Sequence, residues 1–225
     1  MTENGSMCNM NHREKEAIRY LGYGREAVDE ATFLLIKDAF GELERIAEKR
    51  SVCRIFKFTQ ADSSHIRVGE TEIESKNLGK NLQGCSEVIA FAVTLGIGID
   101  RLLTRTSLRD MAKTLVLQAC AAALLEEYCD QVQDALAVEM QTKGLYLRPR
   151  FSPGYGDFSI TYQRWLLRLL DCEKKIGLTL TDSYMMVPSK SVTALIGVSA
   201  IETDCHRQGC ELCGKKDCLY RRDRA

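Results

Sequence analysis

A continuous apolar run over residues 88–96 limits the fold more than any other part of the chain. The run reads Val-Ile-Ala-Phe-Ala-Val-Thr-Leu-Gly, has the length of a β-strand and ends in glycine. Because an uninterrupted apolar run of this length is typical of a fully buried strand, it predicts a central strand of a sheet.

A long helix is expected after this strand. Ser107 is the predicted N-cap, with Asp110 three residues on in place of the usual Glu. The helix is predicted to continue to about residue 140 and to stop before Gly144, with Met111 and Cys120 as core-filling residues. Its predicted inner face consists of Leu108, Met111, Ala112, Leu115, Ala119, Ala122 and Ala123.

Shorter segments with clear periodicity surround these two elements. Helical spacing of apolar residues predicts helices over residues 27–49 and 159–170, with a further short helix over 77–82. Strand patterns cover residues 52–58, 68–73, 178–181 and 191–199. Gly177 is the expected end of the helix that begins at residue 159. This mixture of short strands and separate long helices indicates an α+β fold rather than a regular βαβ series.

Composition narrows the class of protein. A length of 225 residues suits one domain with one sizeable core. The 31 basic and 31 acidic residues cancel, so no overall field favours a nucleic acid or an anionic membrane as partner. No signal-peptide pattern opens the chain, and no apolar run approaches the ~18–20 residues that span a bilayer. We therefore expect a cytoplasmic protein whose ten cysteines are reduced thiols, some of them metal ligands.

All three prolines lie in two stretches, residues 148–158 and 176–192. Proline fixes φ and glycine opens φ values that other residues avoid, so the first stretch predicts a shaped loop carrying Arg150, Gly154 and Tyr155. A guanidinium binds a carboxylate through two parallel hydrogen bonds, and an aromatic face accepts a ring or a cation. These groups fit a site for a small polar ligand. They fit equally a Pro/Gly turn between two helices with a surface arginine.

The two stretches together resemble the reactivation domain of cobalamin-dependent methionine synthase. The Arg-x-x-x-Gly-Tyr motif, with which that family binds S-adenosylmethionine, is matched by Arg150, Gly154 and Tyr155. The second motif of the family reads approximately Gly-x-x-Leu-Thr-Glu-Ser, then Met, then Pro-x-x-Ser-Val. It is matched by Gly177, Leu180, Thr181, Asp182, Ser183, Met185, Pro188, Ser191 and Val192. The match is strong over residues 107–199. The chain resembles a stand-alone, single-domain form of the module.

The resemblance implies a fold and a division of the chain. The fold would be a single C-shaped α+β domain with a mainly antiparallel twisted sheet flanked by long helices, followed by a short Cys-rich tail. The activation-like domain would cover residues 14–200. Outside the resemblance, residues 1–13 are polar and aperiodic and are expected to be a flexible lead-in, and the cysteines within residues 201–225 predict a metal-binding tail.

The resemblance also implies a reaction. The domain would bind S-adenosylmethionine and support the reductive methylation of cob(II)alamin on a partner protein, as one component of a split methionine synthase. A flavodoxin or ferredoxin would donate the electron. Because cofactor and cosubstrate carry the chemistry, no catalytic side chain is expected and the protein's part is positioning.

The cobalamin would be supplied by a separate cobalamin-binding methionine synthase subunit. The usual Asp-x-His-x-x-Gly loop is missing from this chain. Asp62, His65 and Gly69 provide the residue types at the wrong spacing. One face of the domain should therefore be an interface with the subunit that carries the corrinoid.

Four residues of the first motif would line the ligand site on this resemblance. Arg150 would bind the carboxylate of the methionine moiety. Ser152 and Gly154 would present backbone groups, and Tyr155 would lie next to the adenosine or the sulfonium.

Two acidic residues would complete the site. Glu127 best matches the helical glutamate of the family, which would contact the ammonium or ribose groups. Glu126 is equally well placed by spacing, and either residue can instead lie on a solvated helix face. Asp182 stands where the family usually has Glu, and its side chain is one methylene shorter.

Four cysteines in the last part of the chain form a separate motif, consisting of Cys205, Cys210, Cys213 and Cys218. Four thiols within fourteen residues fit a four-thiolate zinc site or an iron–sulfur cluster, and the spacing does not distinguish them. The electron that reactivation requires favours the cluster. Zinc would instead fold a tail that has almost no apolar residues, and a flexible thiol-rich tail is the alternative to both.

Two other functions fit the same sequence. The chain can be a metal-dependent interaction module that docks on a corrinoid protein and has lost ligand binding. It can also be a reactivator for another corrinoid methyltransferase, which the residues of the ligand site do not exclude.

Overall fold

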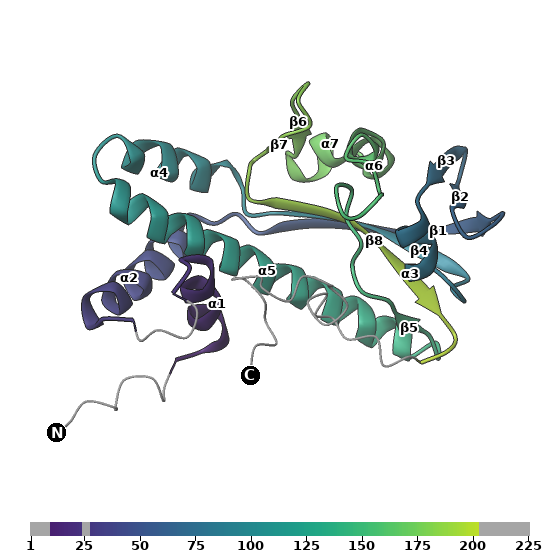
Figure 1. Cartoon of the computed structure of the whole chain (residues 1–225), viewed down its shortest axis with the longest axis horizontal. Coiled ribbons are helices and arrows are strands. Elements are labelled where there is room, and N and C mark those ends of the chain that lie inside the picture. The colour runs from purple at the N-terminus through teal and green to yellow at the C-terminus, as the bar shows by residue number, and fades with distance from the viewer. Residues whose placement is uncertain (1–9, 24–27, 203–225) are drawn as a thin grey trace.

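A computed structural model describes residues 10–23 and 28–202 of the chain. The fold is α+β, and every strand pairing in the described residues is antiparallel, which confirms the predicted fold class. Helices gather at one end of the molecule and the sheet extends to the other (Figure 1). A single long helix, α5 (Met111–Gln141), runs from the helical end along the sheet and so connects the two parts.

The main sheet has the strand order β3-β2-β1-β4-β8-β5. Its strands are β1 (Arg50–Gln60), β2 (His65–Val68), β3 (Thr71–Glu74), β4 (Glu87–Thr94), β5 (Tyr146–Leu147) and β8 (Ser191–Ser199). Along its whole length β4 pairs with β1 on one side and with β8 on the other. The predictions of a central strand over residues 88–96 and of a strand over 191–199 are therefore confirmed. A small hairpin of β6 (Thr179–Leu180) and β7 (Met186–Val187) projects from the body of the molecule (Figure 1).

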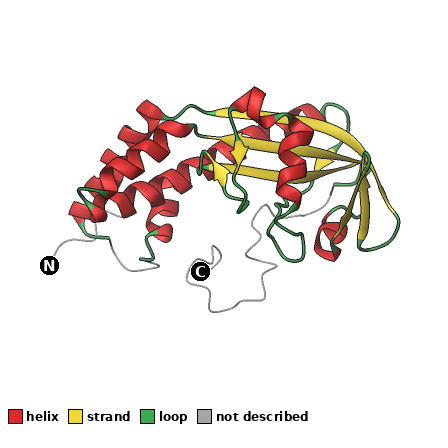
Figure 2. Ribbon diagram, turned by 90° about the horizontal axis from the view of Figure 1, so that it is seen from above, coloured by secondary structure: helices red, strands yellow, loops and turns green. Residues whose placement is uncertain are grey.

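The helices cover both faces of the sheet. Besides α5 they are α1 (His12–Tyr20), α2 (Glu30–Ile46), α3 (Lys76–Asn81), α4 (Ile97–Ser107), α6 (Tyr162–Leu170) and α7 (Cys172–Ile176). Helix α5 lies under one face, and α6 and α7 lie on the opposite face (Figure 1, Figure 2). Helices α1, α2 and α4 pack against α5 at the helical end.

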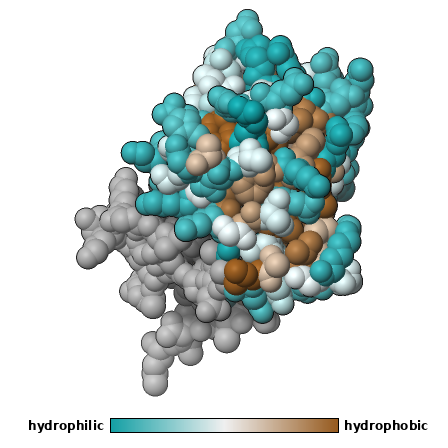
Figure 3. Space-filling view, turned by 90° about the vertical axis from the view of Figure 1, so that its right-hand side faces the viewer, coloured by the Kyte–Doolittle hydropathy of each residue, from teal (hydrophilic) through white to brown (hydrophobic). Residues whose placement is uncertain are grey.

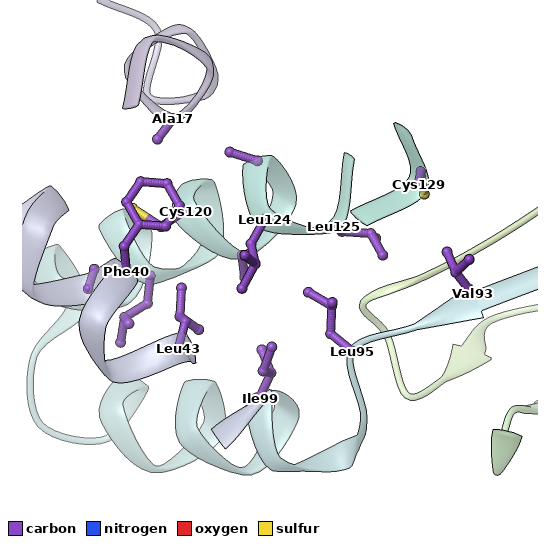
Figure 4. Packing of buried hydrophobic residues seen from close by; sticks show 14 of the residues in the cluster. Ala17, Phe40, Leu43, Val93, Leu95, Ile99, Cys120, Leu124, Leu125 and Cys129 are labelled. Atoms are coloured by element: carbon purple, nitrogen blue, oxygen red, sulfur yellow. The ribbon is translucent and has the colours of Figure 1, made fainter. Parts of the chain in front are cut away.

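Alternate side chains of β4 enter two separate hydrophobic clusters, as the period of a strand requires. The cluster shared with α1, α2, α4 and α5 contains Ile89, Phe91 and Val93. The cluster shared with α3, α6 and α7 contains Val88, Ala90 and Ala92. The first cluster continues into the helical end, where side chains of α2, α4 and α5 point toward one another, as Phe40, Leu43, Ile99 and Leu124 show (Figure 4).

The end of the molecule formed by α3 and the β2–β3 hairpin has a mixed surface. Figure 3 looks onto this end and shows apolar side chains in its middle, surrounded by hydrophilic ones. The expected single strand over residues 68–73 is wrong. Gly69 adopts a φ of 59°, and the segment turns there, so that β2 and β3 form a hairpin.

The expected start of the long helix is also wrong. Ser107 ends the separate helix α4, and α5 is capped by Asp110, whose carboxylate accepts a hydrogen bond from the Lys113 N–H at 2.9 Å. The turn between α4 and α5 shifts the buried stripe of α5. Leu108, Met111 and Ala112 are consequently exposed rather than buried.

The buried stripe of α5 follows a partly different set of positions. Ala119 and Ala123 of the predicted inner face are buried, and the stripe also contains Leu117, Cys120, Ala121 and Leu124. Leu115, which the sequence places on the inner face, is 58% exposed. The prediction of Cys120 as a core residue is confirmed.

Other differences lie near element ends. Helix α1 is not anticipated from the apolar pattern, yet Asn11 and Glu14 form a capping box at its start. The helix predicted over residues 159–170 is followed by a separate helix, α7, because Asp171 has a left-handed φ of 53°. Gly177 ends α7 rather than α6. None of the described helices combines the length and apolarity needed to cross a membrane.

Two leucines of α5 provide a matched test of this packing. Leu117 is fully buried, so Leu117→Ala removes buried methyl groups and leaves a cavity, at an expected cost of about 2–5 kcal/mol in the free energy of unfolding. Leu115→Ala, two residues away on the exposed side, should cost less than about 1 kcal/mol. Urea denaturation monitored by circular dichroism measures both, and equal losses would contradict the assigned helix face.

Candidate functional site

The loop between β5 and α6 runs along the edge of β8. The Arg148 N–H donates to the Gly197 carbonyl at 2.8 Å, and Phe151 and Leu195 exchange both backbone hydrogen bonds at 2.9 Å each. The first part of the loop therefore behaves as a continuation of β5 and has its position fixed by the sheet.

Residues 152–158 then form a compact turn. The Tyr155 N–H donates to the Ser152 carbonyl (3.1 Å), the Phe158 N–H to the Tyr155 carbonyl (3.0 Å), and the Gly154 N–H to the Phe158 carbonyl (2.7 Å). Gly154 has a φ of 96°, a region that favours glycine. These bonds define the shape of the turn without help from a ligand.

Asp157 ties the turn to α3. Its carboxylate accepts hydrogen bonds from the N–H groups of Lys76 (2.8 Å) and Asn77 (3.1 Å) and from the Ser75 hydroxyl. The bond from Ser75 and those from the two N–H groups hold the pKa of Asp157 below its usual value. The neighbouring Gly156 has a φ of 55°, and a Cβ there would lie 2.2 Å from the Nδ2 atom of Asn77. The left-handed backbone at this approach of loop and helix thus favours glycine.

An aromatic row anchors the turn and leaves one ring outside. Phe158 is 1% exposed and stacks between Phe151 (6.2 Å between ring centroids) and Tyr162 (5.5 Å). Tyr155 lies at the end of this row, 6.5 Å from Phe151, and is 68% exposed. Its ring is therefore available to a ligand.

Arg150 extends in the other direction, onto α5. Its guanidinium donates to the Gln133 Oε1 atom (2.8 Å), the Asp130 Oδ1 atom (2.8 Å) and the Glu126 Oε2 atom (3.3 Å). The side chain is 18% exposed. Burial alone would lower the pKa of Arg150, but the carboxylates of Asp130 and Glu126 outweigh it and raise the pKa above its usual value. The site therefore contains a permanent positive charge held by two carboxylates.

The three α5 residues share one side of the helix. Glu126, Asp130 and Gln133 are spaced at i, i+4 and i+7, so they form a stripe facing the loop. Asp130 and Gln133 were not anticipated as site residues. The spacing from Glu126 identifies them once the side of α5 that meets the loop is known.

Two predicted acidic residues do not lie beside Arg150. Glu127 points to α1, where its carboxylate lies 3.8 Å from the Arg13 guanidinium. Asp182 is fully exposed in the turn between β6 and β7, 3.9 Å from an Arg164 nitrogen. Of the two glutamates that spacing left open, Glu126 is the one that reaches the loop.

Ser152, Gly154 and Tyr155 share a loop with Arg150, but some of their backbone groups are already used. The Gly154 N–H and the Ser152 carbonyl take part in the bonds of the turn. The Ser152 N–H and the Gly154 carbonyl have no hydrogen-bond partner among the residues that the structure describes. These two groups, rather than the first two, can face a ligand.

The predicted metal ligands Cys205, Cys210, Cys213 and Cys218 lie outside the described residues. Within the described part of the chain, no group of three or more His, Cys, Asp or Glu side chains is arranged to hold a metal ion. Burial raises the pKa values of the Cys120 and Cys172 thiols to about 12. These two thiols therefore pack in the core as neutral groups.

The fold and site together define an α+β domain that supports a rigid, charged and aromatic loop against one long helix. A family model described as "Vitamin B12 dependent methionine synthase, activation domain" matches residues 78–203, which is more than half of the chain. The chain belongs to this family. The matched segment contains both motifs and β4, α5 and β8, so the family assignment rests on the elements that build the site.

Comparison with solved structures gives the same fold. A crystal structure of the MetH reactivation domain bound to AdoHcy matches with a TM-score of 0.58 and 18% sequence identity, covering 84% of this chain and 77% of that one. At this identity the match describes the fold. The comparison with curated proteins gives no match.

The contacts of Asp157 predict a pH-dependent stability. Its pKa is lowered in the folded state, so its stabilising effect is fully present above the unfolded pKa of about 3.9 and is lost as the pH falls through the folded pKa. We expect Asp157→Asn to be less stable than the unsubstituted chain at pH 7, with the difference shrinking below about pH 4. Thermal unfolding across this pH range measures the difference. Asp182→Asn, in an exposed turn, is the control, and a gap that stays constant with pH would contradict the assignment.

Proposed function

We propose that this chain is the reactivation component of a cobalamin-dependent methionine synthase and binds S-adenosylmethionine between the 148–158 loop and α5. The methyl group would pass to cobalamin on a separate cobalamin-binding subunit, in the cytoplasm, with an electron from a flavodoxin- or ferredoxin-type donor. The observation that carries the proposal is that Gln133, Asp130 and Glu126 of α5 hold the Arg150 guanidinium, in the same loop that exposes Tyr155 and in a chain of this family.

The charges of the site suit this ligand. S-adenosylmethionine carries a carboxylate, an ammonium and a sulfonium, so it is a net cation. Arg150 together with Glu126 and Asp130 has a net charge of −1. The guanidinium already donates three hydrogen bonds to α5, so it would bind the carboxylate of the methionine moiety through its charge and its two remaining N–H donors. One of the two α5 carboxylates can accept hydrogen bonds from the ammonium. We propose that Glu126 or Asp130 binds the ammonium of the ligand. Glu127 is not assigned this role because its carboxylate lies near Arg13.

The loop supplies the remaining contacts. The Ser152 N–H and the Gly154 carbonyl suit polar groups of the adenosine, and the face of Tyr155 suits its ring or the sulfonium. Asp182 is exposed and distant in sequence from these groups, and we propose that it contacts the partner protein or the far end of the ligand.

The proposed reaction requires that the methyl donor and the acceptor be positioned, and it does not require a catalytic side chain. A sulfonium is an activated leaving group, and the nucleophile is supplied on the partner protein. Holding donor and acceptor in line then provides the rate enhancement. The bonds of the loop to β8, α3 and α5 fit this task, since they fix a ligand relative to three elements.

Calorimetry with S-adenosylmethionine tests the ligand. We expect binding to the folded chain, and a loss of affinity of at least about tenfold in Arg150→Ala, because the carboxylate loses its charged partner. Tyr155→Ala should also weaken binding, and it should leave folding intact because the ring is exposed. Arg168→Ala, exposed on α6, is the control.

Two outcomes would contradict the proposal. One is the absence of heat with the folded chain. The other is partner binding that ignores both Arg150→Ala and Tyr155→Ala but is abolished by chelation, as expected for a metal-dependent interaction module. A reactivator for another corrinoid methyltransferase would bind S-adenosylmethionine equally, and would be recognised by its preference among purified corrinoid proteins.

We further propose that Cys205, Cys210, Cys213 and Cys218 together bind an iron–sulfur cluster or zinc. Four closely spaced thiols in a chain of reduced cysteines support this assignment. Protein purified without oxygen should be brown with broad visible absorption if a cluster is present, and colourless with about one zinc per chain otherwise. Substituting Cys210 and Cys213 by Ser should remove the metal, and a chain that contains neither metal would refute the assignment.

A further inference from the structure

The outer edge of β1 remains open over most of its length. Strand β2 pairs with β1 only at residues 58–60, on the side opposite β4. Between residues 50 and 57 no described strand or backbone group bonds to this edge. An open edge presents a row of N–H and C=O groups that can accept another strand. The segment also lacks proline, which would block such pairing.

A hollow of about 410 Å³ lies beside this edge, on the face of the sheet that α5 covers. Ser51 and Cys53 of β1 line one side of it, and Tyr128, Val132 and Leu136 line the α5 side. Ile55 follows Ser51 and Cys53 on the same face of the strand and is 43% exposed. Gln131 and Glu139 of α5 also line the hollow, so a strand added to β1 would find a surface that is largely but not wholly apolar under its side chains on this face.

The hollow and the residues that contact Arg150 (Glu126, Asp130 and Gln133) lie on opposite sides of α5. At about 100° per residue, Tyr128 is rotated by about 200° from Glu126, so the two stripes of the helix diverge. The loop that carries Arg150 borders β8, whereas the hollow borders β1, and β4 lies between these strands. A molecule docked on β1 would therefore leave the 148–158 loop free.

The charges of β1 specify what can dock. The strand carries Arg50, Arg54 and Lys57 and has no acidic residue. Arg50 is paired with Glu48, and Lys57 lies directly opposite Glu87 of β4. Arg54 forms no ion pair with a described carboxylate, and its guanidinium donates to the Leu169 carbonyl. Antiparallel pairing of β1 with a second copy would bring these like charges together, and like charges across a strand pair destabilise it. The edge thus disfavours self-association and favours an acidic segment.

We infer that the outer edge of β1 over residues 50–57 is a docking site for an extended segment of another protein, in which acidic and apolar side chains alternate. The segment would add a strand to the sheet. Its acidic side chains would lie beside Arg54, and its apolar side chains would lie over the hollow and Ile55 on the opposite face.

A labelled eight-residue peptide of alternating Glu and Val tests the inference by fluorescence anisotropy with the full chain. We expect saturable binding that is absent with a Lys–Val peptide of the same length. The variant Arg54→Glu should bind at least about tenfold more weakly, because Arg54 is on the face where the acidic side chains of the peptide would lie. Arg109→Glu makes the same change of net charge at an exposed site between α4 and α5 and should leave binding unchanged.

Two N-methylated peptides separate strand addition from simple charge attraction. Successive N–H groups of a strand point to opposite edges, so methylating alternate residues removes the donors of one edge only. One of the two methylated peptides should lose binding and the other should keep it. Equal binding of both, or no binding of the unmodified peptide, would overturn the inference.

Hydrogen exchange identifies any other occupant. In the free chain the outward amides of residues 50–57 should exchange fast and become protected when the Glu–Val peptide is added. Protection without peptide would show that another segment of this chain covers the edge, and protection that grows with protein concentration would show a second copy. Either result would refute docking by a partner.

Discussion

The burial of β4 on both faces is the constraint on which the remaining structure depends. Because its odd and even positions enter different clusters, each face of the sheet must be covered by helices. Helix α5 covers one face, and α6 with α7 covers the other (Figure 1). The chain between α5 and α6 must then pass from one layer to the other around the edge of β8. The 148–158 loop is that crossing, and its position at the site follows from the two-layer packing.

The loop holds its shape because it is bonded to three different elements. Phe151 pairs with β8, Asp157 caps the start of α3, and Arg150 binds the stripe on α5. A loop attached at one point would order only when a ligand binds, and the ordering entropy would reduce affinity. In this chain the loop is already ordered in the folded protein, so the ordering entropy is lost on folding rather than on ligand binding. The Arg150 contacts also avoid an unpaired buried charge, since two carboxylates and an amide oxygen surround the guanidinium.

How far the sequence predicts this arrangement depends on the kind of signal. β4 and β8 were located well because a buried strand leaves an uninterrupted apolar run that needs no knowledge of its neighbours. The loop was located because proline and glycine report local backbone geometry. The sequence does not identify Asp130 and Gln133 as site residues, and it does not decide which of Glu126 and Glu127 faces the loop. Both results have the same cause. Neighbouring helix positions differ by about 100° in direction, so the facing of α5 depends on tertiary packing.

The same dependence explains the errors at the start of α5. Leu108 and Leu115 have the apolar character of core residues, but Leu108 lies in the turn after α4 and Leu115 lies on the outer side of α5, so both are exposed. Local propensity could not decide this, because Ser107 and Asp110 are both good N-caps. Asp110 is the actual cap because α4 extends through Ser107.

If the site binds a methyl donor as proposed, it must also keep the protein's own nucleophiles away from the activated methyl group. Cys129 lies on α5 next to the residues that contact Arg150 and is fully buried. A nearby guanidinium would favour the thiolate, which is the reactive form of cysteine. Burial has the larger effect, and together with the charge of Glu126 it raises the pKa of Cys129 well above its usual value. The thiol therefore stays protonated and enclosed at neutral pH. The packing of α5 that turns Glu126, Asp130 and Gln133 toward Arg150 thus also encloses the Cys129 sulfur. A bound methyl donor could not react with it.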